Sequence, residues 1–171
     1  MSNIINFDGK VVSTKAMKRI LSHASNKEIG KQLALIRDYI FHEMSSTCEI
    51  CQCVLMGYSG EGKHVADFYD ATEAELYYNE IYLHESEIVD NLGTTILLLT
   101  HSIKEYLTEN FKQKEFSIDI SVSYINWFMR LIKKGNITAH FRVYRASEYP
   151  IPDSSDLDNI KQPMLYVVFK T

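Results

Sequence analysis

The sequence predicts an α+β fold, in which a mostly antiparallel sheet of about five strands packs against helices. The segment from Phe116 to Val122 alternates apolar and polar residues, which is typical of a strand with one buried face. Between about residues 87 and 111, apolar residues recur at three- and four-residue spacing, which predicts a long helix. The whole predicted order is two helices, two strands, two helices, a strand, a helix and two strands, which is an α+β order.

Two helices are expected at the N-terminal end, over residues 14–24 and 26–44. Ser25 precedes the second helix and Glu28 follows three positions later, which is the pattern of a capping box. Residues 1–45 hold seven basic and four acidic side chains, a net charge of +3, whereas the remainder of the chain carries −7. A basic N-terminal segment followed by an acidic remainder indicates that this end meets a polyanion or an acidic partner, unless the difference in charge is a chance fluctuation.

Two strands are expected next, over residues 48–56 and 64–70. Between them, GYSGEGKH is one residue short of a phosphate-binding P-loop, because His64 stands where that loop has a hydroxyl for Mg²⁺. A P-loop also opens a helix, whereas a strand is expected here. The sequence therefore predicts a hairpin loop at 57–62, between the two strands.

The second half of the chain begins with a helix that runs from about residue 70 to Tyr82. The longest helix follows at about 87–111, and its middle is apolar nearly all round, which predicts a place in the centre of the fold. Gly93, near its start, is expected to allow close packing. The remaining elements are a strand, a helix and two strands, expected over residues 116–122, 124–134, 136–145 and 164–170.

The chain of 171 residues is expected to form one domain, with a helical segment at 1–45 and an α+β body at 46–171. No apolar run approaches the roughly 20 residues of a membrane helix, and the first residues lack the pattern of a signal peptide. Three cysteines within six residues do not make a disulfide framework. We therefore expect a soluble protein of the cytoplasm that has no membrane association.

Cys48, Cys51 and Cys53, together with His64, are weak candidates for a metal site, because C-x-x-C can hold zinc. In an extended strand, however, Cys51 and Cys53 share one face and Cys48 points to the other. Free cysteines are also among the most buried residues. We expect cysteines of the core, with no metal and no cofactor.

His140, Arg142 and Tyr144 are expected on the polar face of the strand 136–145, with Arg145 at its end. Side chains two apart on a strand are close neighbours, so this group is a candidate site for a phosphate or carboxylate, or for acid–base chemistry. The alternative is a solvated sheet face, on which acids such as Asp119 pair with the basic side chains.

Residues 25–44, SNKEIGKQLALIRDYIFHEM, resemble the helix-turn-helix of LuxR-type regulators. The resemblance implies DNA binding, with Lys27, Lys31 and Arg37 as candidate contacts to nucleic acid. Ala34 stands where the turn of that motif usually has glycine, so a single helix over 26–44 is the alternative.

The sequence contains no established catalytic or cofactor motif, which favours a non-enzymatic protein over an enzyme. We expect a bacterial-type partner-binding factor, such as an immunity, antitoxin, anti-defence or regulatory protein. Its protein partner is expected to meet acidic surface at 148–158 or at 73–90, where several tyrosines also cluster. The alternatives are a nucleic-acid-binding regulator that uses 25–44, and a small enzyme or anion-binding site at 140–145.

Overall fold

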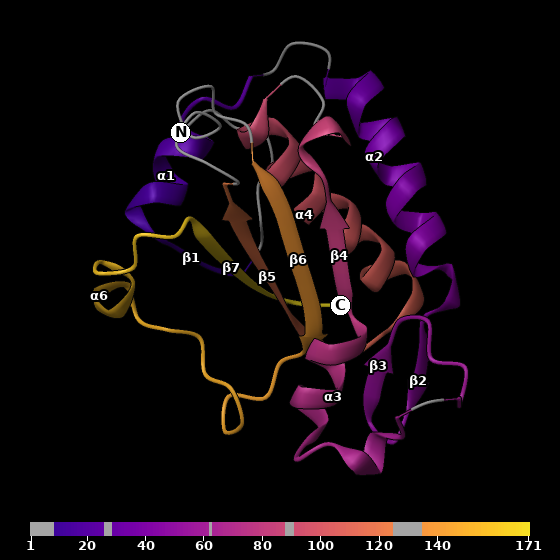
Figure 1. Ribbon diagram of the computed structural model, residues 1–171. Helices are drawn as coiled ribbons and strands as arrows, with labels where there is room; N and C mark the ends of the chain where they lie inside the picture. Colours follow the sequence, from indigo (N-terminus) through magenta and orange to yellow (C-terminus); the bar gives the residue numbers. More distant parts are fainter. Residues whose placement is uncertain (1–8, 26–28, 62, 88–90, 125–134) are drawn as a thin grey trace.

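A five-stranded sheet forms the centre of the molecule, with the strand order β1-β7-β5-β6-β4 and every neighbouring pair antiparallel. The computed structural model describes residues 9–25, 29–61, 63–87, 91–124 and 135–171. The strands of this sheet, seen in Figure 1, are β1 (Lys10–Ser13), β4 (Glu80–Leu83), β5 (Glu115–Ser123), β6 (Asn136–Val143) and β7 (Met164–Lys170). The sheet packs against helices, so the predicted α+β class is confirmed.

The helix α4 (Leu92–Asn110) lies against one face of the sheet, and most of its side chains are buried. It begins where the side chain of Asn91 accepts a hydrogen bond from the N–H of Thr94 at 2.8 Å, which satisfies one of the free donors at a helix start. Along β5, Phe116 and Ile118 point to the same core. The long buried helix predicted from the spacing of apolar residues is therefore confirmed.

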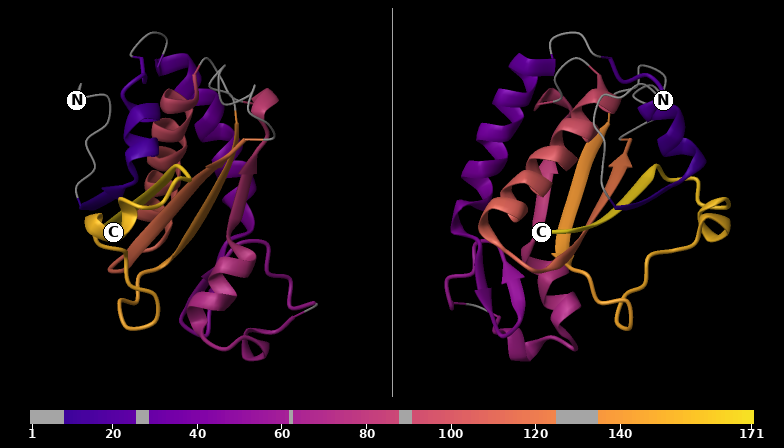
Figure 2. Two further views of the ribbon diagram at one scale, coloured as in Figure 1. Left: turned by 60° about the vertical axis from the view of Figure 1, so that its left-hand side comes forward. Right: turned by 180° about the vertical axis from the view of Figure 1, so that it is seen from behind.

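Two further helices, α1 (Lys15–Leu21) and α2 (Ile29–Glu43), pack against α4 (Figure 2). Ile36 and Ile40 of α2 are buried in the main core. Where α1 meets the start of α4, a Cβ on Gly93 would lie 2.5 Å from the carbonyl oxygen of Ile20, so only glycine fits this approach. This close packing is the one that the sequence predicts at Gly93.

The opposite face of the sheet is covered in part by residues 144–163, which include the short helix α6 (Ser154–Leu157). Ile151 and Leu157 pack there against Val12 of β1 and against Tyr166 and Val168 of β7. The sheet is therefore buried on both faces at β7, which explains why β7 is apolar at nearly every position.

A small unit projects beside the ends of β4 and β6 (Figure 1). We call it the side lobe and define it as residues 48–61 and 63–79. It has its own apolar core, in which Cys53, Leu55 and Ala74 are buried. Its elements are β2 (Cys48–Ile50), β3 (Cys53–Leu55), the 3₁₀ helix η2 (Val65–Asp67) and α3 (Ala71–Tyr78). Two other short 3₁₀ helices are η1 (Met44–Ser46) and η3 (Glu85–Glu87).

The predicted strand 48–56 is wrong, because the chain turns back inside it. Cys51 and Gln52 have φ angles of 50° and 68° and form the two-residue turn between β2 and β3. Turns of this kind usually contain Asn or Gly, and neither residue occurs at positions 51 and 52. β3 pairs with β2 and not with residues 64–70. The predicted strand 64–70 and the predicted hairpin loop 57–62 are therefore wrong as well.

The predicted helix over about 70–82 is too long. α3 ends at Tyr78, and β4 begins at Glu80 and pairs with β6. β4 and β1 are the two edge strands of the sheet, and neither is predicted from the sequence. The sheet still has the expected number of about five strands, because two strands were predicted at the wrong residues. The helix expected at 124–134 lies almost entirely outside the described residues. None of the helices within the described residues is long and apolar enough to cross a membrane.

We predict that Gln52→Gly stabilises the protein by about 0.5–1 kcal/mol, because glycine adopts a positive φ without steric cost. Urea unfolding followed by circular dichroism measures the change. Gln52→Ala is the control and is expected to leave the free energy of unfolding unchanged or slightly reduced. A destabilised Gln52→Gly variant would contradict the turn between β2 and β3.

Candidate functional site

The residues predicted as a site on β6 lie in three different surroundings. The Nε2 atom of His140 is 3.5 Å from a carboxylate oxygen of Glu80 on the neighbouring strand. The side chain of Arg142 is fully buried, and Tyr144 packs beside the apolar cluster under residues 144–163. Arg145 points into the junction with the side lobe. The structure thus gathers no open group of four donors along this strand.

Arg142 lies beneath the segment that covers the sheet. Its Nε atom is 3.4 Å from Oδ2 of Asp119 on β5, and its Cζ atom is 4.7 Å from the ring centre of Tyr149. Burial raises the pKa of Asp119, and the charge of Arg142 opposes this change. Burial, with a contribution from Asp119, also raises the pKa of Tyr166 to about 12. These residues form a buried polar centre of the sheet, closed to a large ligand by residues 144–163.

The carboxylate of Glu75 joins the side lobe to the sheet. It is fully buried, and Oε1 accepts a hydrogen bond from the N–H of Val54 in β3 at 2.8 Å. Its Oε2 accepts from the N–H of Val143 at 3.2 Å and from Nη1 of Arg145 at 2.6 Å. Burial raises the pKa of this carboxyl, while Arg145 and the two N–H groups lower it.

Two neighbouring side chains complete this junction. Nη2 of Arg145 donates to the carbonyl of Gln52 at 2.7 Å, inside the turn between β2 and β3. The amide of Asn79 donates to the carbonyls of Val54 and Phe141, at 2.6 and 2.9 Å. The side lobe is therefore fixed to β6 by directional bonds at both ends of β3.

We predict that Glu75→Ala lowers the free energy of unfolding by about 3–5 kcal/mol, because Arg145 keeps only the more distant Glu148, at 3.9 Å, and the N–H groups of Val54 and Val143 lose their acceptor. Urea unfolding gives the value. The double variant Glu75→Ala/Arg145→Ala is expected to cost less than the sum of the two single changes. Arg37→Ala is the control and is expected to cost much less, because solvent screens its ion pairs with Glu105 and Glu109. Equal losses for Glu75→Ala and Arg37→Ala would contradict the role of Glu75.

The three cysteines are free thiols with different exposures. Cys53 is buried in the core of the side lobe, whereas Cys48 is half-buried and Cys51 is exposed in the turn. Only Cys53 is therefore the core cysteine that the sequence predicts. His64 is exposed and precedes η2, where its backbone N–H donates to Asp67 at 2.7 Å. No group of three metal-ligating side chains occurs in the described part of the chain.

We predict that iodoacetamide at pH 8 modifies Cys51 at least about 100-fold faster than Cys53. Burial raises the pKa of Cys53 to about 11, so only about one thiol in a thousand is ionised at that pH. Fragment-ion mass spectrometry distinguishes the two sites within one peptide. In urea the two cysteines are expected to react at similar rates. Equal rates in the folded protein would place Cys53 outside the core.

The candidate contacts to nucleic acid do not form a basic surface among the described residues. The Nε atom of Arg37 is 2.9 Å from Glu105 of α4, and its Nη2 is 3.7 Å from Glu109. Lys27 and the side chain of Lys31 lie outside the description. Residues 29–43 form one helix, without the turn that a helix-turn-helix needs near Ala34.

The side lobe exposes a group of aromatic side chains, which we call the aromatic surface. Tyr69 is 95% exposed and Tyr77 is 58% exposed. Phe68 and Tyr78 pack against Tyr77 with ring centres 5.3 and 5.1 Å away, and Tyr58 packs against Tyr78 at 5.4 Å. A layer of packed rings thus supports Tyr77, whereas Tyr69, the residue after Phe68, is exposed to solvent on nearly its whole surface.

Acidic residues outnumber basic ones in the side lobe. The side lobe has six acidic side chains and one lysine, a net charge of −5, and Glu75 is the only buried one among the six. Glu75 and Glu49 have basic partners outside the side lobe, Arg145 and Lys114. The lysine, Lys63, lies over the rings of Tyr77 and Phe68, with its Nζ atom 5.1 and 5.4 Å from their centres. The side lobe therefore combines exposed rings with an excess of acidic side chains.

The sequence pointed to only part of this surface. It placed Tyr77 and Tyr78 on one helix, as the structure does, but it placed Tyr82 on the same helix, whereas Tyr82 lies on β4. It assigned Phe68 and Tyr69 to a strand, so their approach to α3 was not foreseen. Two acids of the predicted surface at 148–158 have partners within the molecule. Glu148 accepts a hydrogen bond from the hydroxyl of Thr72 at 2.5 Å, and Asp158 forms an ion pair with Lys15 at 3.3 Å.

Comparison of the chain with protein-family models, with curated proteins and with solved structures found no significant match.

Proposed function

We propose that the protein binds a basic protein partner through the aromatic surface of the side lobe. The observation that supports this most is the exposure of Tyr77 on a layer of packed rings, with the exposed Tyr69 next to Phe68 of that layer in the sequence. Tyrosine is enriched among the residues that dominate binding energy, because its ring buries a large area and loses little conformational entropy. A partner that covers these two rings would remove apolar surface from water.

Charge favours a basic partner over a nucleic acid. Glu75 is paired with Arg145 and Glu49 with Lys114, so the other four acids of the side lobe and Lys63 leave a net charge of −3. This charge attracts Lys and Arg side chains and repels phosphates. Opposite charges across an interface accelerate association, and salt weakens this effect. The proposal therefore includes binding that slows as the salt concentration rises.

The junction with the sheet supports a rigid presentation of this surface. Arg145 holds the turn of the hairpin at Gln52, and Glu75 and Asn79 hold Val54 in its second strand. A surface that is ordered before binding loses less entropy when the partner arrives. The other two hypotheses find less support, because Arg37 is paired with acids of α4 and Arg142 is fully buried.

The test compares three baits in lysate of the native host, each with and without nuclease: the unchanged protein, Tyr69→Ala/Tyr77→Ala, and Tyr82→Ala. Tyr82 is the matched control, because it is 45% exposed but lies on β4, outside the side lobe. We expect a stoichiometric protein that survives nuclease, stays on the control and is lost from the double variant. With that protein purified, the double variant is expected to weaken affinity by about 30-fold or more.

A partner that the double variant retains would contradict the proposal. Capture of nucleic acid alone would instead favour the nucleic-acid hypothesis. The charge component has its own test in Glu61→Lys, which reverses one exposed acid of the side lobe. This variant is expected to slow association several-fold at low salt and to leave the stability of the protein unchanged.

A further inference from the structure

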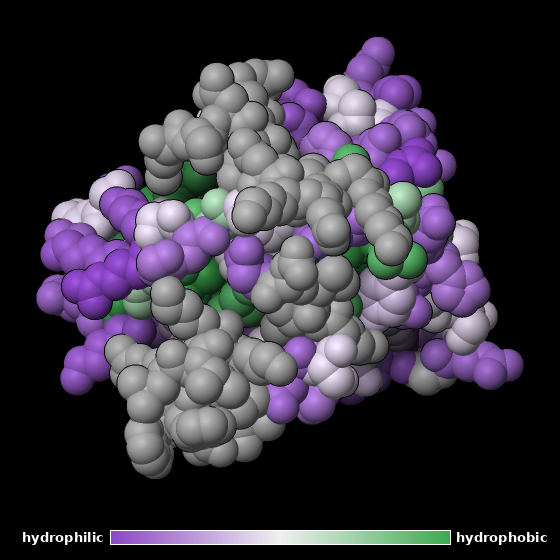
Figure 3. All heavy atoms as spheres, turned by 90° about the horizontal axis from the view of Figure 1, so that it is seen from above, coloured by the Kyte–Doolittle hydropathy of each residue, from purple (hydrophilic) through white to green (hydrophobic). Residues whose placement is uncertain are grey.

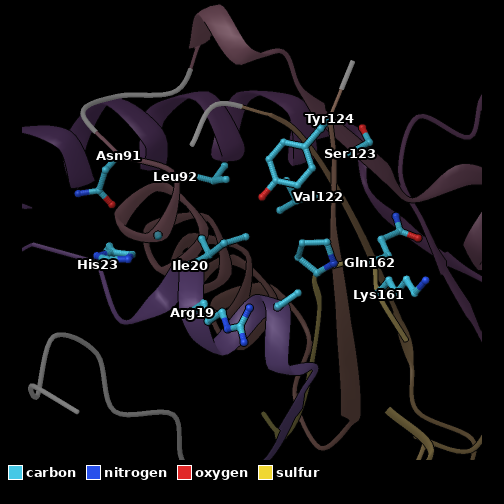
Figure 4. Close-up of a pocket in the computed structure, with 13 residues that line it drawn as sticks. Arg19, Ile20, His23, Asn91, Leu92, Val122, Ser123, Tyr124, Lys161 and Gln162 are labelled. Atoms are coloured by element: carbon cyan, nitrogen blue, oxygen red, sulfur yellow. The ribbon is translucent and has the colours of Figure 1, made fainter. Parts of the chain in front are cut away.

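A pocket of about 550 Å³ opens at the other end of the molecule from the side lobe. It lies between α1, the first turn of α4, the end of β5 and residues 161–163, as Figure 4 shows. Figure 3, which views this end from above, shows apolar residues visible between hydrophilic side chains. The volume is in the range of pockets that take small organic molecules.

The interior of the pocket is apolar. Ile20 of α1, Leu92 of α4 and Val122 of β5 converge on it, and the ring of Tyr124 points into the same space (Figure 4). Pro163 adds a further apolar side chain from the segment before β7. An interior of this kind favours a hydrocarbon or aromatic body over a fully hydrated ion.

The rim of the pocket is basic and polar. Arg19 lies on α1 and His23 just after its end, and Lys161 lies on another side of the pocket in Figure 4. None of the described lining residues is acidic. Arg19 and Lys161 have no ion pair among the described residues, whereas the nearby Lys15 pairs with Asp158. Two cationic side chains at the mouth of an apolar pocket thus remain available to an anion.

The walls of the pocket are fixed by contacts between elements. The hydroxyl of Thr14 accepts hydrogen bonds from the N–H groups of Met17 and Met164, at 3.2 and 3.0 Å, and so ties α1 to β7. The N–H of Ser25 donates to the hydroxyl of Thr94 at 3.0 Å, and Gly93 admits α1 at close range. The pocket is therefore formed before any ligand enters it.

We propose that this pocket binds a small amphipathic anion, with its apolar body on Ile20, Leu92 and Val122 and its carboxylate or phosphate at the basic rim to which Arg19 and Lys161 belong. The site is separate from the aromatic surface and does not depend on the proposed partner. The protein thus has two proposed sites, this small-molecule pocket and the surface of the side lobe that binds a protein partner.

Decanoate is the probe, and decan-1-ol, which has the same chain length and no charge, is its matched control. We expect saturable binding of decanoate in isothermal titration calorimetry, with an affinity at least about tenfold above that of decan-1-ol. Arg19→Ala/Lys161→Ala is expected to weaken decanoate binding by about tenfold and to leave decan-1-ol binding nearly unchanged. Lys18→Ala removes a charge beside Arg19 outside the lining residues, and is expected to have no effect.

A second variant tests the pocket by its volume. Ala16 lines the pocket from α1 and is half-buried, so Ala16→Phe is expected to fill the space and abolish binding of both probes, with little change in melting temperature. Equal binding of decanoate and decan-1-ol would overturn the assignment of an anion. Absence of saturable decanoate binding, or binding that neither variant changes, would overturn the site itself.

Discussion

The buried carboxylate of Glu75 is the interaction on which the arrangement of the molecule depends most. A charged group in the interior is stable only when each of its oxygens has a partner, and here the partners come from three places: β3, the end of β6 and Arg145. The carboxylate sits on α3, so the helix cannot shift without breaking these bonds. The side lobe and the edge of the sheet therefore act as one folded unit.

The central part of the fold was predictable from the sequence because its signals are local. β5, β6, β7 and α4 each carry an apolar pattern with the period of their own structure. The turn at Cys51 and Gln52 was not predictable, because its positive φ angles are imposed by pairing of β2 with β3 and by the bond from Arg145 to the carbonyl of Gln52. β4 was hidden for a different reason, since its apolar residues Ile81 and Leu83 also suit a continued helix.

The candidate sites were less predictable than the fold. His140 and Arg142 are neighbours in the sequence, yet their different burial follows from residues 144–163, whose path over the sheet has no local pattern. Arg19 and Lys161 are far apart in the chain and line the same pocket only because α1 directly follows β1, which pairs with β7. Of the basic side chains in residues 1–45, Arg19 thus lies at the pocket rim and Arg37 lies on the face of α2 that meets α4.

The pairing of β1 with β7 also bears on how the chain folds during synthesis. In the order β1-β7-β5-β6-β4, the strand made last lies second in the sheet, between the first strand and β5. β1 has no partner until β7 has left the ribosome, and the pocket between α1 and residues 161–163 cannot form earlier. Long-range pairings of this kind slow folding, because the chain must close a large loop before any contact rewards it. The nascent protein is thus expected to join its side lobe to β4, β5 and β6 before β1 finds its partner and the pocket forms.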